Sequence, residues 1–357
     1  MNFFFLLFFC LLFTGCYSVD QTYQQIKILM NQEPLSKAIA DNEGKPERLE
    51  KLKLVKPILD FAEKEIELTP KNSYQKFVEL NSPYVSWVVQ ASSKRQLTLK
   101  TWWFPFIGNQ PYLGFFVKEN AMKESQKLKK ENYDVSFGGT KAFSLLGYYP
   151  DPLYSSMIDG VSTPNFIETL IHETVHRTIY VKGDYAFNEN LANFIARKGT
   201  ENFLKLHPEL GVKSDDYVHD YEKNQIAQVK FNEFLMKKKK ELIEFYEKLK
   251  GDPKARDEES FLKIRQAKFD EIADQYSAFM GENAKGTYYE YAFSKGKFNN
   301  ASILAYSVYE QDQKPLEGIY LKSNSNLKQM VLRLKSCLYS YSDSDEKIWT
   351  ILSYCFK

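Results

Sequence analysis

The segment His172-Glu173-Thr174-Val175-His176 constrains this chain more than any other feature of its sequence. Residues four apart in an α-helix lie on one face, so both imidazoles can reach a single metal ion if the segment is helical. Glu173 would lie about 100° around the helix from His172, where it can hold a metal-bound water without taking a ligand position. The segment therefore predicts a helix that carries two metal ligands with a carboxylate beside them.

Glu189 follows in the segment Phe187-Asn188-Glu189-Asn190-Leu191-Ala192 and is expected to supply a third ligand from the next helix. Two histidines, one carboxylate and an open fourth position form the set typical of catalytic rather than structural zinc. Asp184 and Glu201 are alternative ligands, although Asp184 is close to the expected helix end and Glu201 is about three turns beyond Glu189. Asn193, one turn after Glu189, is a candidate to hold a histidine ring in place.

The chemistry that this set permits is hydrolysis of a peptide bond. At pH 7 a peptide carbonyl resists attack by neutral water. Zinc lowers the pKa of a bound water and polarises the substrate carbonyl, and both effects favour that attack. A carboxylate beside that water can take its proton and pass it to the leaving amine, which is the role predicted for Glu173. Tyr306, Tyr309 and His219 are candidates, by residue type alone, for a donor that stabilises the oxyanion. We therefore expect a zinc-dependent peptidase with one Zn²⁺.

Composition limits the alternatives. Hydrophobic residues make up 43% of the 357 residues and aromatic residues 15%, which is ample for a buried core and excludes general disorder. The formal net charge is only +2, with 48 basic and 46 acidic residues spread along the chain, so no nucleic-acid partner is expected.

The N-terminus has the pattern of an export signal. Residues 3–13 form an unbroken apolar run that is too short to span a bilayer and typical of a signal peptide. The run ends in Phe13-Thr14-Gly15-Cys16, which resembles a bacterial lipobox, although Phe13 replaces the usual leucine and no Lys or Arg precedes the run. We expect residues 1–15 to be a lipoprotein signal peptide and Cys16 to be acylated. The protein would then be exported and lipid-anchored to a bacterial membrane, at the periplasmic face or the outer membrane; an ordinary signal peptide cut nearby is the alternative.

The remaining cysteines form an even pair. If Cys10 leaves with the signal and Cys16 carries lipid, Cys337 and Cys355 remain in an oxidising compartment. A disulfide between them is expected there, and two free buried thiols are the alternative.

Apolar spacing divides residues 16–357, expected to be one catalytic unit, into four parts. They are N-terminal helices at 17–82, a sheet with the metal helices at 83–210, a charged helical hairpin at 216–280, and a C-terminal helical part at 284–357. The breaks at 42–46 and 251–253 separate helices within the first and third parts. The predicted fold class is α+β, mostly helical, with a small mixed sheet next to the metal helix.

Short β-rich segments precede the metal helix, at 85–89, 101–104, 112–116, 133–137 and 142–146. Gly138-Gly139 reads as a hairpin turn between the last two. The segment 142–146 is either an edge strand that pairs with substrate backbone or an ordinary core strand.

The metal helix itself is expected to begin with Thr163 as N-cap and Pro164 in its first position, and to end at Gly183. Its apolar face consists of Phe166, Ile167, Leu170, Ile171, Val175 and Ile179.

With these residues in view, the chain resembles the bacterial family of predicted aminopeptidases, lipobox-bearing zinc peptidases of the gluzincin type with a zincin-like fold. The resemblance covers residues 75 to about 310 and is most specific from His172 to Glu189. It is also carried by Pro83-Tyr84-Val85-Ser86-Trp87, Trp103-Phe104-Pro105, Tyr112-Leu113-Gly114-Phe115-Phe116, Tyr133-Asp134-Val135 with Gly138-Gly139, Leu146-Gly147-Tyr148 before Asp151-Pro152, and Phe298-Asn299-Asn300-Ala301. It implies zinc at His172, His176 and Glu189, Glu173 as catalytic base, and a peptide substrate.

Related exopeptidases bind the substrate amine with acidic residues of a Gly-x-Met-Glu-Asn segment upstream of the metal helix. This chain has no such segment, and Gly281-Glu282-Asn283 lies downstream, so endopeptidase action stays open. A second class of function also remains, a lipoprotein that binds a metal or a partner without turnover. The intact Glu173 favours the enzyme, because a non-catalytic metal binder does not need that carboxylate.

Overall fold

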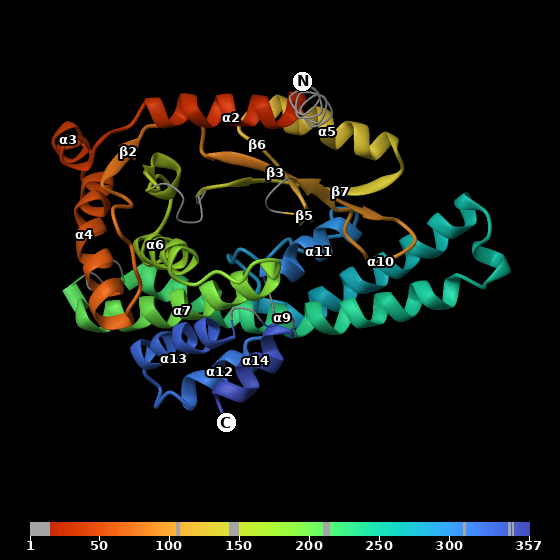
Figure 1. Ribbon diagram of the computed structural model, residues 1–357. Helices are drawn as coiled ribbons and strands as arrows, with labels where there is room; N and C mark the ends of the chain where they lie inside the picture. Colours follow the sequence, from red (N-terminus) through yellow and green to blue (C-terminus); the bar gives the residue numbers. More distant parts are fainter. Residues whose placement is uncertain are drawn as a thin grey trace, which may run out of the picture.

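Helices form most of the molecule, and three small sheets lie between a helical layer that contains α2 and α5 and a second one that contains α6, α7 and α9 (Figure 1). This computed structural model describes residues 15–104, 108–142, 150–209, 215–309, 312–341, 344 and 346–357. The predicted fold class, mostly helical α+β with small mixed sheets and a His172–His176 helix near Glu189, is confirmed.

The N-terminal part contains short strands that the helical spacing did not reveal. Its elements are α2 (Gly15–Met30), β1 (Glu33–Pro34), α3 (Leu35–Asp41), α4 (Pro46–Ile66) and β2 (Lys76–Val78). Strand β2 pairs antiparallel with β1 and parallel with β8 (Leu153–Tyr154), which gives a mixed sheet. Strands of two or three residues depend on partners distant in sequence, so periodicity carries no signal for them.

A second sheet has the order β6-β3-β7 and is antiparallel throughout. It consists of β3 (Ser86–Ser93), β6 (Leu113–Phe115) and β7 (Tyr133–Thr140); α5 (Lys118–Lys130) precedes β7, and β4 (Trp102–Phe104) with β5 (Gly108–Gln110) forms a separate hairpin. Helix α2 joins this unit, because the Phe116 N–H donates a hydrogen bond of 3.0 Å to Gln21 Oε1.

The predicted hairpin turn at Gly138 and Gly139 is wrong. Strand β7 runs straight through both glycines, which lie opposite Val88 and Trp87 of β3. A Cβ on Gly139 would come within 2.3 Å of the Tyr84 ring, so this glycine permits a close approach rather than a change of direction. Residues 143–146 of the predicted edge strand at 142–146 lie outside the described residues.

The metal helix is α6 (Thr163–Thr178), which follows the short 3₁₀ helix η1 (Ser155–Met157). Its N-cap is Ser162 rather than Thr163, since the Ser162 Oγ accepts a hydrogen bond from the Asn165 N–H. The helix ends before the predicted stop at Gly183, because Ile179 takes an extended conformation and is buried. Gly183, with φ +84°, instead shapes the turn before α7 (Tyr185–Leu206).

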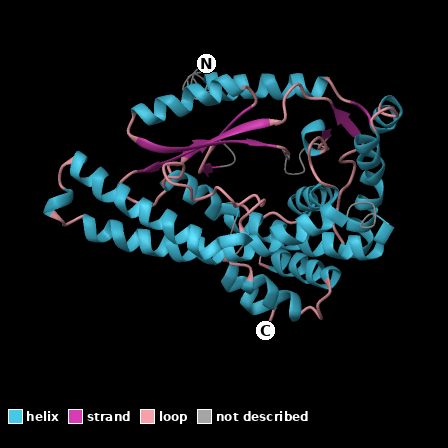
Figure 2. Cartoon of the chain, turned by 180° about the vertical axis from the view of Figure 1, so that it is seen from behind, coloured by secondary structure: helices cyan, strands magenta, loops and turns pink. Residues whose placement is uncertain are grey.

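The described elements in the rest of the chain are all helices, and residues 284–299 form turns and loop in place of the helix expected there. Its elements are α9 (Asp215–Leu249), η2 (Pro253–Ala255), α10 (Glu258–Met280), η3 (Gly281–Asn283), α11 (Asn300–Tyr309), α12 (Lys314–Leu321), α13 (Leu327–Ser340) and α14 (Ile348–Cys355). Helices α9 and α10 form the long arm on one side of the molecule and lie side by side in both views (Figures 1 and 2). In the part of the chain that the structure describes, no helix combines the length and apolar character needed to cross a lipid bilayer.

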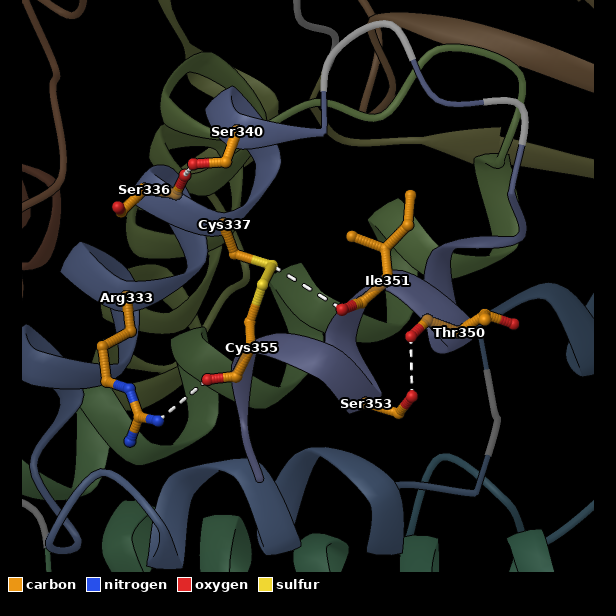
Figure 3. The surroundings of a disulfide bond; sticks show 8 residues. All are labelled: Arg333, Ser336, Cys337, Ser340, Thr350, Ile351, Ser353 and Cys355. Atoms are coloured by element: carbon orange, nitrogen blue, oxygen red, sulfur yellow. Dashed lines mark hydrogen bonds between the residues drawn. A yellow bond between two sulfur atoms is a disulfide. The ribbon is translucent and has the colours of Figure 1, made fainter.

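A disulfide joins Cys337 of α13 to Cys355 of α14, with the Cα atoms 5.9 Å apart (Figure 3). Arg333 Nη2 donates a hydrogen bond of 3.0 Å to the Cys355 carbonyl oxygen beside it. The bridge and the hydrogen bond hold the C-terminal helix against α13.

Two large cores organise the helices. The first, which we name the metal-helix core, lies mainly between α4, α6, α7, α13 and α14 and is mostly aliphatic; its members include Leu52, Ile58, Ile66, Phe166, Ile167, Leu170, Ile171, Val175, Ile179, Leu191, Ile195, Met330, Leu334 and Ile351. The second, the hairpin core, lies between α9, α10, α11 and the segment between η3 and α11. It is rich in rings, which include Phe231, Phe234, Tyr246, Phe261, Phe269, Tyr276, Tyr289, Phe293 and Phe298. The predicted apolar face of the metal helix is fully buried in the first core.

Candidate metal centre

Helices α6 and α7 are placed by their apolar faces and by the loop between them. Asp184 caps α7, with its carboxylate accepting a hydrogen bond of 3.0 Å from the Phe187 N–H. Asn188 holds the loop through two hydrogen bonds of 2.8 Å, one to the N–H and one to the carbonyl oxygen of Val181. Glu189 is the next residue, so the bonds that fix the loop also fix the position from which Glu189 extends.

Three predicted ligands converge between these helices. The Nε2 atoms of His172 and His176 are 3.1 Å apart. Glu189 Oε1 lies 3.2 Å from His176 Nε2, and Glu189 Oε2 lies 3.4 Å from His172 Nε2. Among the described residues these three form the group of histidine, cysteine and acidic side chains that could hold a metal ion. Asp184 and Glu201, the alternative ligands, are not part of it.

The spacing of these atoms fits zinc. A tetrahedral zinc ion with ligands at about 2.05 Å requires its ligand atoms to be about 3.3 Å from one another. The histidine nitrogens are 3.1 Å apart, and the two oxygens of Glu189 lie 3.2 Å from His176 (Oε1) and 3.4 Å from His172 (Oε2), so each of these contacts is close to that value. His176 and Glu189 are each 7% exposed. The donor set and its mutual distances therefore suit one small divalent cation without rearrangement of the helices.

The charges in this cluster stabilise one another. Burial raises the pKa of Glu189, but hydrogen bonds and positive charge from His172 and His176 outweigh burial and lower it to about 2. Burial lowers the pKa of His172, but Glu189 outweighs this effect and raises it to about 9. Glu189 is therefore an anion at neutral pH, as a metal ligand must be.

Glu173 differs from Glu189 in its surroundings. Burial raises its pKa, and the positive charge of His172 and His176 opposes the shift without cancelling it. The negative charges of Glu189 and Asp151 add to the increase. A carboxylate with a raised pKa accepts a proton more readily near neutral pH, which suits a general base.

A buried ion pair connects the metal helix to a neighbouring segment of the chain. Arg177, next to His176, contacts Asp151 with an Nη1 to Oδ2 distance of 3.2 Å, and the two side chains are only 2% and 1% exposed. The backbone of Asp151 accepts a hydrogen bond from the Tyr74 N–H and donates one to Ser73 Oγ. Arg177 thus connects α6 to the segments that precede β2 and β8. The sequence contained no spacing that would have paired Arg177 with Asp151.

A cavity of about 580 Å³ opens beside the ligands. Its walls come from α6, α7, α9 and the segment after η3, and they consist of Asn165, Glu168, Thr169, His172, Glu173, Asn193, Asn224, Gln225, Gln228, Tyr288 and Tyr289. His172 and Glu173 lie in this wall, so a cation held by the three ligands would be reached from the cavity. The volume is within the range of small-molecule binding sites.

The other predicted site residues are dispersed. Asn193 lines the same cavity as His172 and Glu173, and its support of a histidine ring stays a prediction. Tyr306 belongs to the hairpin core, where its ring lies 5.1 Å from that of Phe231, and His219 is exposed on α9. Tyr309 is the last residue of α11, and its side chain lies outside the described part. None of these three donors is among the described residues of the cavity wall.

Most residues of the cavity wall were not predicted from the sequence. Glu168 could have been found, because it precedes His172 by four residues and so shares its helix face. Asn224, Gln225, Gln228, Tyr288 and Tyr289 had no such signal, since their approach depends on how the hairpin packs against α6.

A sequence model of a known family, described as "Putative aminopeptidase", matches residues 16–348. The chain belongs to this family. Searches of curated proteins and of solved structures each found no match. Membership of this family, together with a His172-His176-Glu189 group that could hold a metal ion, indicates a peptidase.

Proposed function

We propose that this protein is a zinc-dependent aminopeptidase in which His172, His176 and Glu189 hold one Zn²⁺ and Glu173 is the general base. One observation carries the proposal: two histidine nitrogens 3.1 Å apart, each facing one oxygen of the Glu189 carboxylate at 3.2 or 3.4 Å, lie beside a cavity that Glu173 also lines. Family membership supports the choice of a peptide substrate.

Each group in the site would have a separate role in peptide hydrolysis. Zinc, when bound, would polarise the substrate carbonyl and lower the pKa of water. Glu173 takes a proton from the attacking water and delivers it to the leaving amine, which its raised pKa favours. Amide side chains of the wall, such as Asn193 and Asn224, can donate to and accept from the peptide backbone. Tyr288 and Tyr289, which line the cavity, join the earlier candidates for the oxyanion donor.

The test compares the full-length wild type with Glu173→Gln. We expect about one zinc per chain in both proteins, cleavage of peptides by the wild type, and a rate at least about 100-fold lower in the variant. Glu222→Gln, an exposed position on α9, serves as the matched control and should cleave normally. Zinc without cleavage of any library peptide by the wild type would instead support a metal-binding lipoprotein without turnover.

We also propose that the protein is exported and held at a bacterial membrane by lipid on Cys16. Cys16 is the second residue of α2. The same helix exposes Tyr23, Ile26 and Met30, at 62%, 51% and 80%, and their spacing places them on one side of the helix. Such a stripe suits a helix close to lipid.

Metabolic labelling with a radioactive fatty acid tests the anchor. The wild type should incorporate label and remain with membranes, whereas Cys16→Ser should lose the label. An exported wild-type protein without label would indicate an ordinary signal peptide.

A further inference from the structure

Apart from His172, the charged side chains among the described residues that line the cavity are acidic. Two carboxylates, Glu168 and Glu173, lie in its wall, and no Lys or Arg is among the described residues that line it. Five amide side chains make up most of the remaining polar surface: Asn165, Asn193, Asn224, Gln225 and Gln228. Away from the proposed zinc and His172, a substrate's free carboxylate would find no Lys or Arg among these residues, whereas an ammonium group would find anions and carbonyl oxygens.

Glu168 is the carboxylate that the proposed reaction leaves unused. It lies one helical turn before His172, on the same face of α6, about 6 Å away along the helix axis. The amine and carbonyl of an N-terminal residue are separated by a single Cα. A peptide whose first carbonyl is beside His172 and Glu173 therefore places its terminal amine within one helical turn of the reacting bond, which Glu168 can reach.

The surroundings of Glu168 keep its carboxylate close to the cavity. Its side chain is half-buried. Tyr221 of α9 is 4% exposed; burial raises the pKa of its hydroxyl well above the ordinary value, and the negative charge of Glu168 raises it further. Tyr221 is thus close enough to Glu168 for their side chains to interact.

We propose that Glu168 binds the protonated N-terminal amine of peptide substrates and so restricts cleavage to the first peptide bond. This assignment rests on the proposed peptidase function and deepens it. It gives the metal helix itself the role of recognising the free end of the substrate, and it makes Glu168 a specificity residue rather than part of the proton transfer.

The first experiment measures kcat/KM for tripeptide amides with a free N-terminus and for the same peptides acetylated. The wild type should prefer the free amine by roughly 100-fold. Glu168→Gln should lose most of that preference through a lower rate on free-amine peptides, with unchanged rates on acetylated peptides and unchanged zinc content. The preference of the wild type should also decline above about pH 8, where the terminal amine loses its proton.

A second measurement uses binding and needs no turnover. Zinc-loaded Glu173→Gln is titrated by calorimetry with one tripeptide amide, free or acetylated, and compared with Glu168→Gln/Glu173→Gln. The single variant should bind the free peptide more tightly, and the double variant should bind both equally. Glu222→Gln, combined with Glu173→Gln, is the matched control and should keep the difference.

The outcomes separate this inference from the proposed function. Cleavage of free and acetylated peptides with equal efficiency, or an equal loss on both in Glu168→Gln, would overturn the role of Glu168 while the peptidase stands. Binding that favours the free amine through Glu168, without cleavage by the wild type, would uphold the amine site and overturn the enzyme. Equal binding of both peptides by zinc-loaded Glu173→Gln would overturn the amine site.

Discussion

The metal-helix core and the hairpin core differ in what they give to the site. All three candidate ligands and Glu173 come from α6 and α7, whose apolar faces lie in the mostly aliphatic metal-helix core. The ring-rich hairpin core contributes no candidate ligand among the described residues. It supplies only the facing cavity wall, through α9 and Tyr289. We conclude that the candidate ligands depend on one core, whereas the cavity depends on both.

The largest expected effect comes from a change in the ligand group, on the side of the metal-helix core. Glu189→Gln keeps the shape of the side chain but removes the charge that the two histidines need to hold a cation. Zinc content should fall from about one ion per chain to a small fraction, and peptide cleavage should be lost. Elemental analysis after dialysis measures the zinc content. Full zinc retention in this variant would remove Glu189 from the ligand set.

The second prediction concerns the buried pair behind the metal helix. Arg177→Met leaves Asp151 as a buried charge without this partner, which should lower the free energy of unfolding by about 3 kcal/mol. The double variant Arg177→Met/Asp151→Leu should recover part of that loss. Urea unfolding of the single and double variants measures both effects. Equal losses in the two would show that the pair itself is not the cause.

The third prediction tests whether the C-terminal helices of the metal-helix core matter for the chemistry. Replacing both Cys337 and Cys355 by serine removes a bridge between residues 18 apart, at an expected cost of up to about 3 kcal/mol. Zinc content and kcat should stay unchanged, because neither cysteine belongs to the ligand group or to the cavity wall. Thermal unfolding and metal analysis of the same sample check this. A parallel loss of zinc would extend the metal site to α13 and α14.

The smallest expected effect comes from a change in the hairpin core. Phe231 is fully buried, and its ring stacks on Tyr289 of the cavity wall with centroids 4.5 Å apart. Phe231→Leu should cost about 1.5 kcal/mol of stability and raise KM several-fold, while zinc content stays at the wild-type level. Leu242→Val, a buried change elsewhere in the same core, is the control and should leave KM unchanged. A loss of zinc in Phe231→Leu would contradict the division between the cores.

These two regions also differ in how far the sequence predicts them. The ligand set could be found because its signal is local: two histidines one helical turn apart, and an acid at the start of the next helix. The helices and the fold class followed from apolar spacing. The partner of Arg177, the route of β7 through Gly138 and Gly139, and the short strands β1 and β8 all depend on contacts between distant segments, which a single sequence does not encode in any spacing.

The cavity wall is the clearest case of this limit. Gln228 and Tyr289 are polar and aromatic residues in segments whose own patterns indicate only a charged helix and an aromatic-rich helical part. They become part of the cavity wall because α9 packs beside α6. Tyr306 and His219, two of the predicted oxyanion donors, are not among the described residues of the cavity wall, because residue type without placement does not select Tyr289 over Tyr306.

Asn188 and Glu189 are neighbours with different tasks, since the first ties down the loop at Val181 and the second faces the histidines. Breaking the hydrogen bonds of Asn188 would loosen the exposed stretch around Lys182 and Gly183 and, through the shared backbone, displace Glu189 from the histidines. Trypsin cutting after Lys182 would report this from the surface, because Asn188→Ala should be cut there faster than the wild type.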